Sequence, residues 1–431
     1  MKLVYLVIDG APDGLKSETS LSVADTPALD YIASISRCGL MYTISKGIAP
    51  ESDAAVFSIL GYDPEKSYTG RGPIEALGAG LKLKEGYEVA FRANFATVKN
   101  DKLELIDRRC GRDLKTEEAL ELAKAVDGLD LGKYDAYARV VATVGHRAVV
   151  IISSKKYRLS GNVSNTDPAY AKKGYISVAV KNYEMKVNEC KPLDESSEAA
   201  RTAELANIFT RKSFEILDKH PVNLRREANG KLKANVVLLR DSGDRLPEVK
   251  PINEKLGLTF SAIAEMPVEK GIARLLKMEV AEVPPPTEDK ESDYRQRLEA
   301  TLELLEKYDV VYVHLKGPDE PGHDGDFKRK IKAIELIDRY YVSRLLDKVD
   351  LESIAFLVTS DHSTPWTLKA HSDDPVPVLF YRPGIKSDGI KRFCEKACAE
   401  GSLGIIEHGW QLLPRIVEEL KSLKKWKSPN F

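Results

Sequence analysis

The stretch Leu3-Val4-Tyr5-Leu6-Val7-Ile8-Asp9-Gly10 decides the fold of this 431-residue chain. Its first six side chains form one continuous apolar and aromatic run, which is typical of a strand buried on both faces of a parallel sheet. The run ends on the carboxylate of Asp9, and Gly10 favours a turn after it. The pattern therefore predicts a central parallel strand that carries an acidic side chain to one edge of a sheet.

Further apolar runs alternate with helical patterns in the C-terminal half of the chain. Strands are predicted at Val310–Leu315, Ile354–Thr359 and Val376–Tyr381, and helices at 292–307 and 327–346, with Ser292 as the N-cap of the first. Strands that alternate with helices are typical of layered α/β proteins. We therefore predict an α/β fold with a doubly wound, mostly parallel sheet.

Residues 86–190 interrupt this alternation. Short strand patterns dominate the segment, and Thr116–Val126 is its one clear amphipathic helix. Such a mixture can form a compact sheet domain of its own. We predict a smaller α+β domain at 86–190, inserted into a core domain that comprises residues 1–85 and 191–431.

Composition excludes several classes of function. The formal net charge is −1, so the chain has no bulk attraction for nucleic acid or anionic membranes, and no apolar run reaches membrane-spanning length. The N-terminus runs directly into the first strand, which leaves no room for a signal peptide. Five cysteines without framework spacing are interpreted as buried thiols, and Lys421, Lys424, Lys425 and Lys427 as a solvated tail. We expect a cytoplasmic protein without nucleic-acid or membrane partners.

Carboxylates and imidazoles follow several of the predicted strands. Taken singly, each has an ordinary explanation, because Asp-Gly usually marks a turn and a lone histidine is usually a core or surface residue. Together they are less ordinary, because three of only seven histidines lie near strand ends beside carboxylates, where α/β proteins bind ligands. The set comprises Asp9, Asp319, His323, Asp361, His362 and His371. His314 lies within its strand and is interpreted as a core or supporting residue.

Ser52 supplies a candidate nucleophile for this set. It precedes a helical pattern at 54–60, and a helix N-terminus offers N–H groups to a phosphate. On local sequence alone, a helix cap is the commoner role of such a serine. Mixed carboxylate and imidazole donors suit divalent cations of the manganese kind, and the absence of cysteine argues against a structural zinc site. Two such cations about 4 Å apart would form a clamp for phosphoryl transfer.

Two basic segments lie in the predicted inserted domain. Asp107-Arg108-Arg109-Cys110-Gly111-Arg112 packs three arginines into five positions, and Gly145-His146-Arg147 lies at a break between strands. Guanidinium groups present a planar fork that matches carboxylates and phosphates. A solvated surface cluster is an equally good reading of these segments.

Several segments together resemble the alkaline phosphatase superfamily and, within it, the archaeal type of cofactor-independent phosphoglycerate mutase. The resemblance covers most of the chain, and the segment Thr359-Ser360-Asp361-His362-Ser363-Thr364-Pro365 is its most specific part for the superfamily. Gly61-Tyr62-Asp63-Pro64 and Asp107-Arg108-Arg109 point to the mutase branch. The other segments are Val7-Ile8-Asp9-Gly10, Ser52-Asp53, Gly70-Arg71-Gly72, Phe91-Arg92-Ala93-Asn94, Gly145-His146-Arg147, 319–324 and His371-Ser372.

The resemblance implies a reaction, cofactors and residue roles. The reaction would interconvert 3-phosphoglycerate and 2-phosphoglycerate, as in glycolysis and gluconeogenesis, with two divalent metals and no bisphosphoglycerate. Manganese is the expected metal, with cobalt or zinc as alternatives. The implied ligands are Asp9, Ser52, Asp361 and His362 for one metal, and Asp319, His323 and His371 for the other. Ser52 would form a phosphoserine, Asp107 would act as acid and base, and the carboxylate of phosphoglycerate would be clamped by Arg108, Arg109, Arg112, His146 and Arg147.

Two departures from the family and three rival functions accompany this reading. Glu51 precedes Ser52 where the family carries a small residue, and 240–243 differs from the glycine-rich segment expected there. The rivals are a metal-dependent phosphatase or phosphodiesterase on the same core, a phosphopentomutase, and a non-catalytic metal-binding module. A hydrolase needs no arginine clamp around glycerate, so the arginines argue against it.

Overall fold

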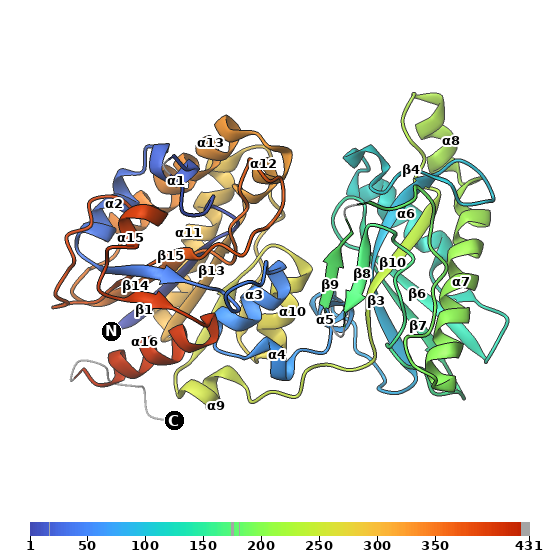
Figure 1. Cartoon of the computed structure of the whole chain (residues 1–431), viewed down its shortest axis with the longest axis horizontal. Coiled ribbons are helices and arrows are strands. Elements are labelled where there is room, and N and C mark those ends of the chain that lie inside the picture. Colours follow the sequence, from blue (N-terminus) through green and yellow to red (C-terminus); the bar gives the residue numbers. More distant parts are fainter. Residues whose placement is uncertain (17, 174–175, 181, 424–431) are drawn as a thin grey trace. The chain divides into compact units, whose positions relative to one another are not determined.

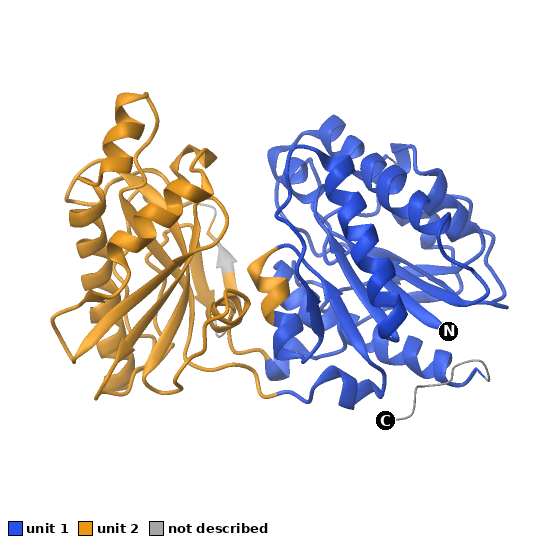
Figure 2. Ribbon diagram, turned by 180° about the vertical axis from the view of Figure 1, so that it is seen from behind, with its two compact units in different colours: residues 1–67, 249–265, 272–431 blue, residues 68–248, 266–271 orange. Residues whose placement is uncertain are grey.

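The chain forms two compact units, which Figure 2 shows in separate colours. The computed structural model describes residues 1–16, 18–173, 176–180 and 182–423. Unit 1 comprises residues 1–67, 249–265 and 272–431, and unit 2 comprises 68–248 and 266–271. Of the basic tail, Lys424, Lys425 and Lys427 lie outside the described residues. No helix among those described has the length and apolar character that a membrane crossing needs.

Unit 1 is built on a mixed sheet of eight strands among the residues that the structure describes. Its order is β12 (Glu279–Ala281), β11 (Phe260–Ile263), β13 (Val310–Leu315), β1 (Lys2–Ile8), β14 (Ile354–Thr359), β15 (Val376–Tyr381), β2 (Arg37–Met41) and β16 (Gly404–Ile406). The first five strands are parallel, and β15 is antiparallel to both neighbours. The mostly parallel α/β fold predicted from the apolar runs is confirmed.

The three central strands end at the same level. Val7 of β1 lies opposite His314 of β13 and opposite Thr359 of β14. The residues that follow these strands therefore emerge together at one edge of the sheet, as parallel strands require. This register is what brings Asp9 close to the segments around Asp319 and Asp361.

Helices cover both faces of this sheet (Figure 1). On one face, Leu6 of β1 shares a buried core with Leu298 of α11 (Lys290–Lys307) and Ile334 of α13 (Phe327–Ile337). On the other face, the Tyr5 hydroxyl donates to the Ile59 carbonyl of α3 (Ser52–Ile59), 3.1 Å away. The further helices of unit 1 are α1 (Ser20–Val23), α2 (Pro27–Ser34), α4 (Pro64–Ser67), α9 (Ile252–Leu256), α12 (Asp319–Asp324), α14 (Ser343–Leu346), α15 (Glu395–Cys398) and α16 (Leu412–Lys421). The sheet is therefore covered twice, as predicted.

One local prediction in unit 1 is wrong. The α11 helix begins at Lys290, and Asp289 rather than Ser292 is its N-cap, because the Asp289 carboxylate accepts the N–H of Ser292. Residues 319–324 form the short helix α12. The predicted helix at 327–346 is confirmed, as α13, a π-helical turn at Asp338–Val342 and α14 (Ser343–Leu346). Side-chain periodicity does not reveal the π-helical turn.

Unit 2 is an α+β unit built on an antiparallel sheet. Its strands are β10 (Val236–Gly243), β3 (Glu88–Val98), β7 (Arg147–Ser154), β6 (Ala136–Ala142) and β5 (Leu129–Asp130), with β4 (Leu105–Asp107) beside β3 and a separate pair of β8 (Tyr170–Lys173) and β9 (Ile176–Ala179). Its helices are α5 (Arg71–Gly78), α6 (Thr116–Val126), α7 (Ser197–Leu217) and α8 (Pro221–Ala228), and α10 (Pro267–Leu275) spans the division between the residue sets.

Unit 2 is larger than the inserted segment of 86–190 suggested by the sequence. Phe209 of α7 packs with Phe91 and Phe95 of β3, and β10 pairs with β3 along its length. The β10 strand runs through 240–243, the segment that departs from the family. The difference arises because strand pairing and helix packing assign residues 191–248 to this sheet, and neither is encoded in local periodicity.

Candidate active site

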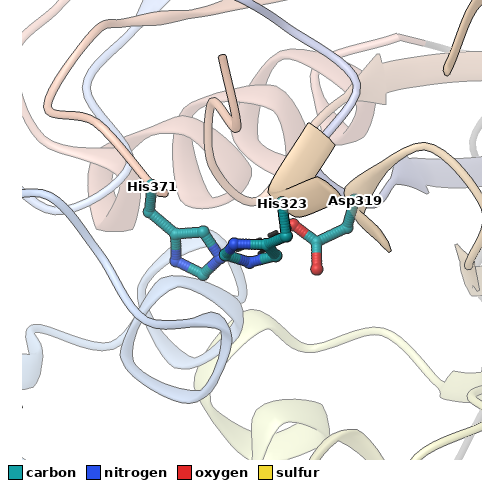
Figure 3. Close-up of side chains that lie close together, drawn as sticks. All are labelled: Asp319, His323 and His371. Atoms are coloured by element: carbon teal, nitrogen blue, oxygen red, sulfur yellow. Dashed lines mark hydrogen bonds and ion pairs between the residues drawn. The ribbon is translucent and has the colours of Figure 1, made fainter. Parts of the chain in front are cut away.

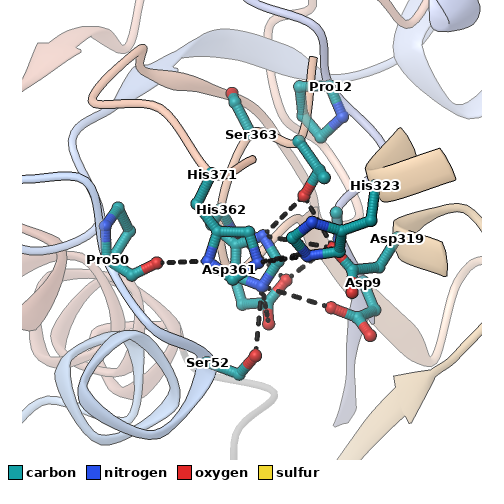
Figure 4. Close-up of polar contacts among 12 residues, drawn as sticks. Asp9, Pro12, Pro50, Ser52, Asp319, His323, Asp361, His362, Ser363 and His371 are labelled. Atoms are coloured by element: carbon teal, nitrogen blue, oxygen red, sulfur yellow. Dashed lines mark hydrogen bonds and ion pairs between the residues drawn. The ribbon is translucent and has the colours of Figure 1, made fainter. Parts of the chain in front are cut away.

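Ser52 is the first residue of α3, and Glu51 occupies the N-cap position. The sequence pattern placed Ser52 before the helix, whereas in the structure the serine lies within the first turn. Its hydroxyl oxygen lies 3.1 Å from Nε2 of His362 (Figure 4). The first turn of a helix presents backbone N–H groups that have no partner within the helix, together with the positive end of the helix dipole. This environment suits a serine that accepts a phosphoryl group.

A first group of candidate metal ligands surrounds His362. Its Nε2 atom lies 3.2 Å from Oδ2 of Asp361 and 3.4 Å from Oδ1 of Asp9. These two carboxylate oxygens are buried, and neither accepts a hydrogen bond from a residue in the described ranges. Burial and the charge of Asp361 raise the pKa of Asp9, although Lys316 opposes that shift. Two buried carboxylates with unsatisfied oxygens that face one another fit the site of a divalent cation.

A second group comprises Asp319, His323 and His371 (Figure 3). The Nε2 atoms of the two histidines lie 3.1 Å apart, and each is 3.5 Å from Oδ1 of Asp319. Asp319 and His323 can meet because they are four residues apart on α12.

The backbone orients both imidazoles of this second group. His323 Nδ1 lies 3.2 Å from the Lys369 carbonyl, and His371 Nδ1 lies 2.7 Å from the Pro50 carbonyl. A carbonyl can only accept, so each Nδ1 carries a proton and each Nε2 faces the shared centre, which is the arrangement of metal-ligating histidines. Burial lowers the pKa of His371, but the hydrogen bond to Asp319 and the charge of Glu51 outweigh it and raise that pKa to about 10.

The two groups adjoin each other. The rings of His362 and His371 stack with centroids 3.7 Å apart, and Asp9, Asp319 and His362 also present ligand atoms within 4.8 Å of one another. All seven residues predicted from the strand ends and from Ser52 therefore lie together in unit 1 (Figure 4).

Two neighbours of this site were missed or underrated from the sequence. Lys316 Nζ lies 2.8 Å from Oδ2 of Asp9, and its only sequence signal is its place directly after β13. His314 is fully buried, with Nε2 at 3.6 Å from Oδ2 of Asp361 and Nδ1 at 3.0 Å from the Tyr312 hydroxyl. Asp9, His314 and Asp361 form a further set of possible ligands.

The predicted acid and base, Asp107, and one predicted substrate-binding residue, Arg108, have protein partners in unit 2. Oδ1 of Asp107 accepts the N–H groups of Arg109 and Gly111, at 2.6 and 3.0 Å, and so closes a turn. Arg108 donates through Nε and Nη2 to the two oxygens of Asp167, at 2.6 and 2.5 Å. The planar fork of Arg108 is therefore already engaged by a buried carboxylate.

The remaining predicted residues lie in a positive region. His146 lies in the turn directly before β7, and burial together with Arg147, Arg109 and Arg92 lowers its pKa to about 3. Burial also lowers the pKa values of Arg109 and Arg147. Arg112 is exposed. His146 is consequently a neutral hydrogen-bonding group among guanidinium groups.

Three arginines that the sequence analysis did not select extend this region. Arg71 Nε lies 2.6 Å and Arg92 Nε 3.4 Å from the same Oε1 atom of Glu75. Arg240 lies directly opposite Arg92 in the β10–β3 ladder, with Asp241 nearby. Burial and the charges of Arg240 and Arg71 lower the pKa of Arg92 to about 10. Like charges opposite one another are unfavourable, so a bound anion would stabilise these three arginines. Only the register of the strands shows that Arg92 and Arg240 are neighbours.

Fold and site together define the class of this protein. It is an α/β protein whose parallel strands bring a serine hydroxyl beside two groups of carboxylate and imidazole donors that suit divalent metals.

Comparison with known proteins gives the family. The family model for 2,3-bisphosphoglycerate-independent phosphoglycerate mutase matches residues 33–223. A protein of that name from Aeropyrum pernix is 46% identical over 425 residues, covering 97% of this chain and 100% of the relative. The chain belongs to the 2,3-bisphosphoglycerate-independent phosphoglycerate mutase family, which confirms the family predicted from its motifs.

Solved structures agree with this assignment. The cofactor-independent phosphoglycerate mutase from Thermoplasma acidophilum is 32% identical with a TM-score of 0.59, covering 98% of this chain and 100% of that one. A protein from Pyrococcus horikoshii has a TM-score of 0.77 at 29% identity, with 99% of each chain covered.

Proposed function

We propose that this chain interconverts 3-phosphoglycerate and 2-phosphoglycerate through a phosphoserine at Ser52, without bisphosphoglycerate. One observation carries the proposal: the Ser52 hydroxyl lies 3.1 Å from His362, beside the carboxylates of Asp9 and Asp361. The family membership of the chain supports the same reaction. The reaction would serve glycolysis and gluconeogenesis, and its substrate supports a cytoplasmic location.

Two divalent cations fit the residues of unit 1. We assign one to Asp9, Ser52, Asp361 and His362, and the other to Asp319, His323 and His371. The unsatisfied oxygens of Asp9 and Asp361, and the facing Nε2 atoms of His323 and His371, support this assignment. Bound cations would activate the serine hydroxyl and neutralise the phosphoryl oxygens. Manganese is the proposed metal, with cobalt or zinc as alternatives, because all three accept these donors.

The reaction balances on the groups of the chain and the substrate. The Ser52 hydroxyl gives up its proton as its oxygen forms a bond to phosphorus, the bond from phosphorus to the glycerate oxygen breaks, and that glycerate oxygen gains a proton. The second glycerate hydroxyl then loses its proton and takes the phosphoryl group, and the Ser52 oxygen regains a proton as its bond to phosphorus breaks. Exclusion of water is required, because water would hydrolyse the phosphoserine.

The arginines of unit 2 are assigned to the carboxylate of the substrate. Of the predicted residues, Arg109, Arg112, His146 and Arg147 are retained, and Arg71, Arg92 and Arg240 are added because they crowd around Glu75 and Asp241. Arg108 stays in the proposed set, but we assign it mainly to holding the structure around the substrate site, because its guanidinium group is paired with Asp167. Asp107 is retained as the acid and base for the glycerate hydroxyls through the oxygen that does not close its turn.

A coupled assay with enolase tests the function. The protein is stripped of metal by chelation, one metal is added back at a time, and 3-phosphoglycerate is supplied. Formation of 2-phosphoglycerate supports the proposal, whereas free phosphate as the main product supports the hydrolase. Turnover of ribose 1-phosphate in place of 3-phosphoglycerate would support a phosphopentomutase. If no substrate is turned over with any metal, the result would support a non-catalytic metal-binding module.

A further inference from the structure

Thr364 contacts one ligand from each candidate metal group. It lies two residues after His362 and is fully buried. Its hydroxyl oxygen is 2.7 Å from Oδ1 of Asp319 and 3.0 Å from Nδ1 of His362. A single hydroxyl group thus joins two side chains that we assign to different metals.

The chemistry of the three groups fixes the direction of these hydrogen bonds. An ionised carboxylate can only accept, so the one hydroxyl proton of Thr364 is donated to Asp319. The Thr364 oxygen must then accept from His362, which places the imidazole proton on Nδ1. The other nitrogen, Nε2, is left without a proton and faces Ser52 at 3.1 Å. The threonine therefore selects the His362 tautomer that can bind a metal.

A buried ion pair holds the backbone of Thr364. Its carbonyl accepts from Lys330 Nζ at 2.7 Å, and its N–H donates to the Pro12 carbonyl at 3.0 Å. Lys330 Nζ also lies 2.7 Å from Oδ1 of Asp13, and both side chains are fully buried. The pair ties the loop after β1 to the loop after β14, and those loops carry Asp9, Asp361 and His362. Burying the Lys330–Asp13 pair costs desolvation free energy, and we interpret its role as fixing the position of the Thr364 backbone.

Two glycines leave the Thr364 side chain little room to move. A Cβ atom on Gly10 would lie 2.7 Å from the Thr364 hydroxyl oxygen, and one on Gly322 would lie 2.6 Å from the Thr364 carbonyl. Gly10 also has a positive φ of 59°. The close packing keeps the hydroxyl at its two partners.

We propose that Thr364 is a positioning residue that couples the two metal-ligand groups. Its hydroxyl sets the tautomer of His362 and the orientation of Asp319 at the same time. The inference rests on the proposed metal sites and goes beyond them, because Thr364 binds neither metal. Groups of this kind affect metal affinity by about 10- to 100-fold.

The test compares Thr364→Val, which keeps the shape and removes the hydroxyl, with Thr364→Ser, which keeps the hydroxyl. Manganese is titrated calorimetrically into the metal-free full-length chain. Thr364→Val is expected to weaken binding at both groups by about 10- to 100-fold, and Thr364→Ser to stay close to the unaltered chain. Nitrogen NMR of His362 in the metal-free chain is expected to show loss of the Nδ1 proton preference in Thr364→Val only.

Thr359→Val provides the matched control. Thr359 is the last residue of β14, five residues before Thr364; it is fully buried and donates to the Pro377 carbonyl at 2.9 Å. It should lose thermal stability without losing metal affinity. The inference is overturned if Thr364→Val binds both metals as the unaltered chain does, or if Thr359→Val weakens them equally. Failure of the proposed function looks different, because the unaltered chain itself would then bind no metal pair or form no 2-phosphoglycerate.

Discussion

At the scale of single residues, α3 carries two serines in very different surroundings. Ser52 lies at the start of the helix beside His362, whereas Ser58 is fully buried within it. Only the first can reach a substrate phosphorus. The difference comes from tertiary placement, since both serines lie in the same short helix of the structure.

Ser52→Ala should abolish mutase turnover, by about 10³-fold or more, because the group that accepts the phosphoryl is lost. Manganese binding at Asp319, His323 and His371 should persist, because none of these ligands is altered. The enolase-coupled rate and a metal titration measure the two effects. Ser58→Ala is the control and should remain active; equal loss in both variants would remove Ser52 from the mechanism.

Neighbouring arginines should respond differently to truncation. Arg108→Ala leaves the buried Asp167 without its partner, so unfolding should become easier by about 3 kcal/mol. Arg109→Ala should chiefly raise KM for 3-phosphoglycerate. Denaturant unfolding and steady-state kinetics separate the effects. If Arg109→Ala alters only stability, the cluster around it is structural.

His146 predicts a specific pH dependence of stability. Its pKa falls from an ordinary 6.5 to about 3 because burial and nearby guanidinium groups oppose its charge. Below about pH 6.5 the unfolded chain binds a proton that the folded chain does not, so stability is lost as pH falls. Between pH 7 and pH 5, the Tm of the His146→Gln variant should therefore fall by less than the Tm of the unaltered chain. Parallel declines in the two proteins would contradict this assignment.

At the scale of elements, the start of α11 shows how a helix chooses its cap. Both Asp289 and Ser292 are residue types that cap helices, and the sequence pattern favoured the serine. The structure uses Asp289, whose carboxylate accepts the Ser292 N–H at 3.1 Å. The helix thereby gains its first turn, Lys290 to Ser292.

Asp289→Ala should destabilise unit 1 by about 1 kcal/mol, because a backbone N–H loses its partner. Ser292→Ala should change stability by less than half of that, since its hydroxyl does not cap the helix. Chemical denaturation of both variants, followed by far-UV circular dichroism, measures the difference. A larger cost for Ser292→Ala would restore the cap that the sequence suggested.

At the scale of the whole molecule, the candidate metal ligands come from loops and helix starts that all belong to unit 1. Asp9 follows β1, Asp361 follows β14, and Asp319 lies on α12 after β13. Burial and the nearby charge of Asp361 raise the pKa of Asp9, so a cation between these carboxylates would stabilise their charged forms. Metal binding should therefore stabilise these loops selectively.

Chelation should lower the free energy of unfolding of unit 1 by about 2.7 kcal/mol for each metal site, if the free metal concentration before chelation is 100 times the Kd of that site. Hydrogen exchange should accelerate at 9–14, 319–324 and 361–372, and stay unchanged in β3 and β7 of unit 2. Mass spectrometry of the metal-loaded and chelated full chain measures both regions. Uniform acceleration in the two units, or none in either, would speak against metals at this site.

Local pattern sufficed for much of this protein. Continuous apolar runs identified β1, β13, β14 and β15, because strands buried on both faces must be apolar throughout. Polar residues directly after such runs identified Asp9 and Asp361, because parallel strands deliver their ends to one edge. Motifs identified the family.

Tertiary structure alone decided the rest. Residues 191–248 belong to unit 2, where β10 pairs with β3. Arg92 and Arg240 lie opposite each other in that pair of strands, and Thr364 links His362 to Asp319. Each of these depends on register or packing between segments distant in sequence, and periodicity within one segment carries no information about its partner. The sequence therefore determined which side chains could do chemistry, whereas the pairing of strands determined which of them touch.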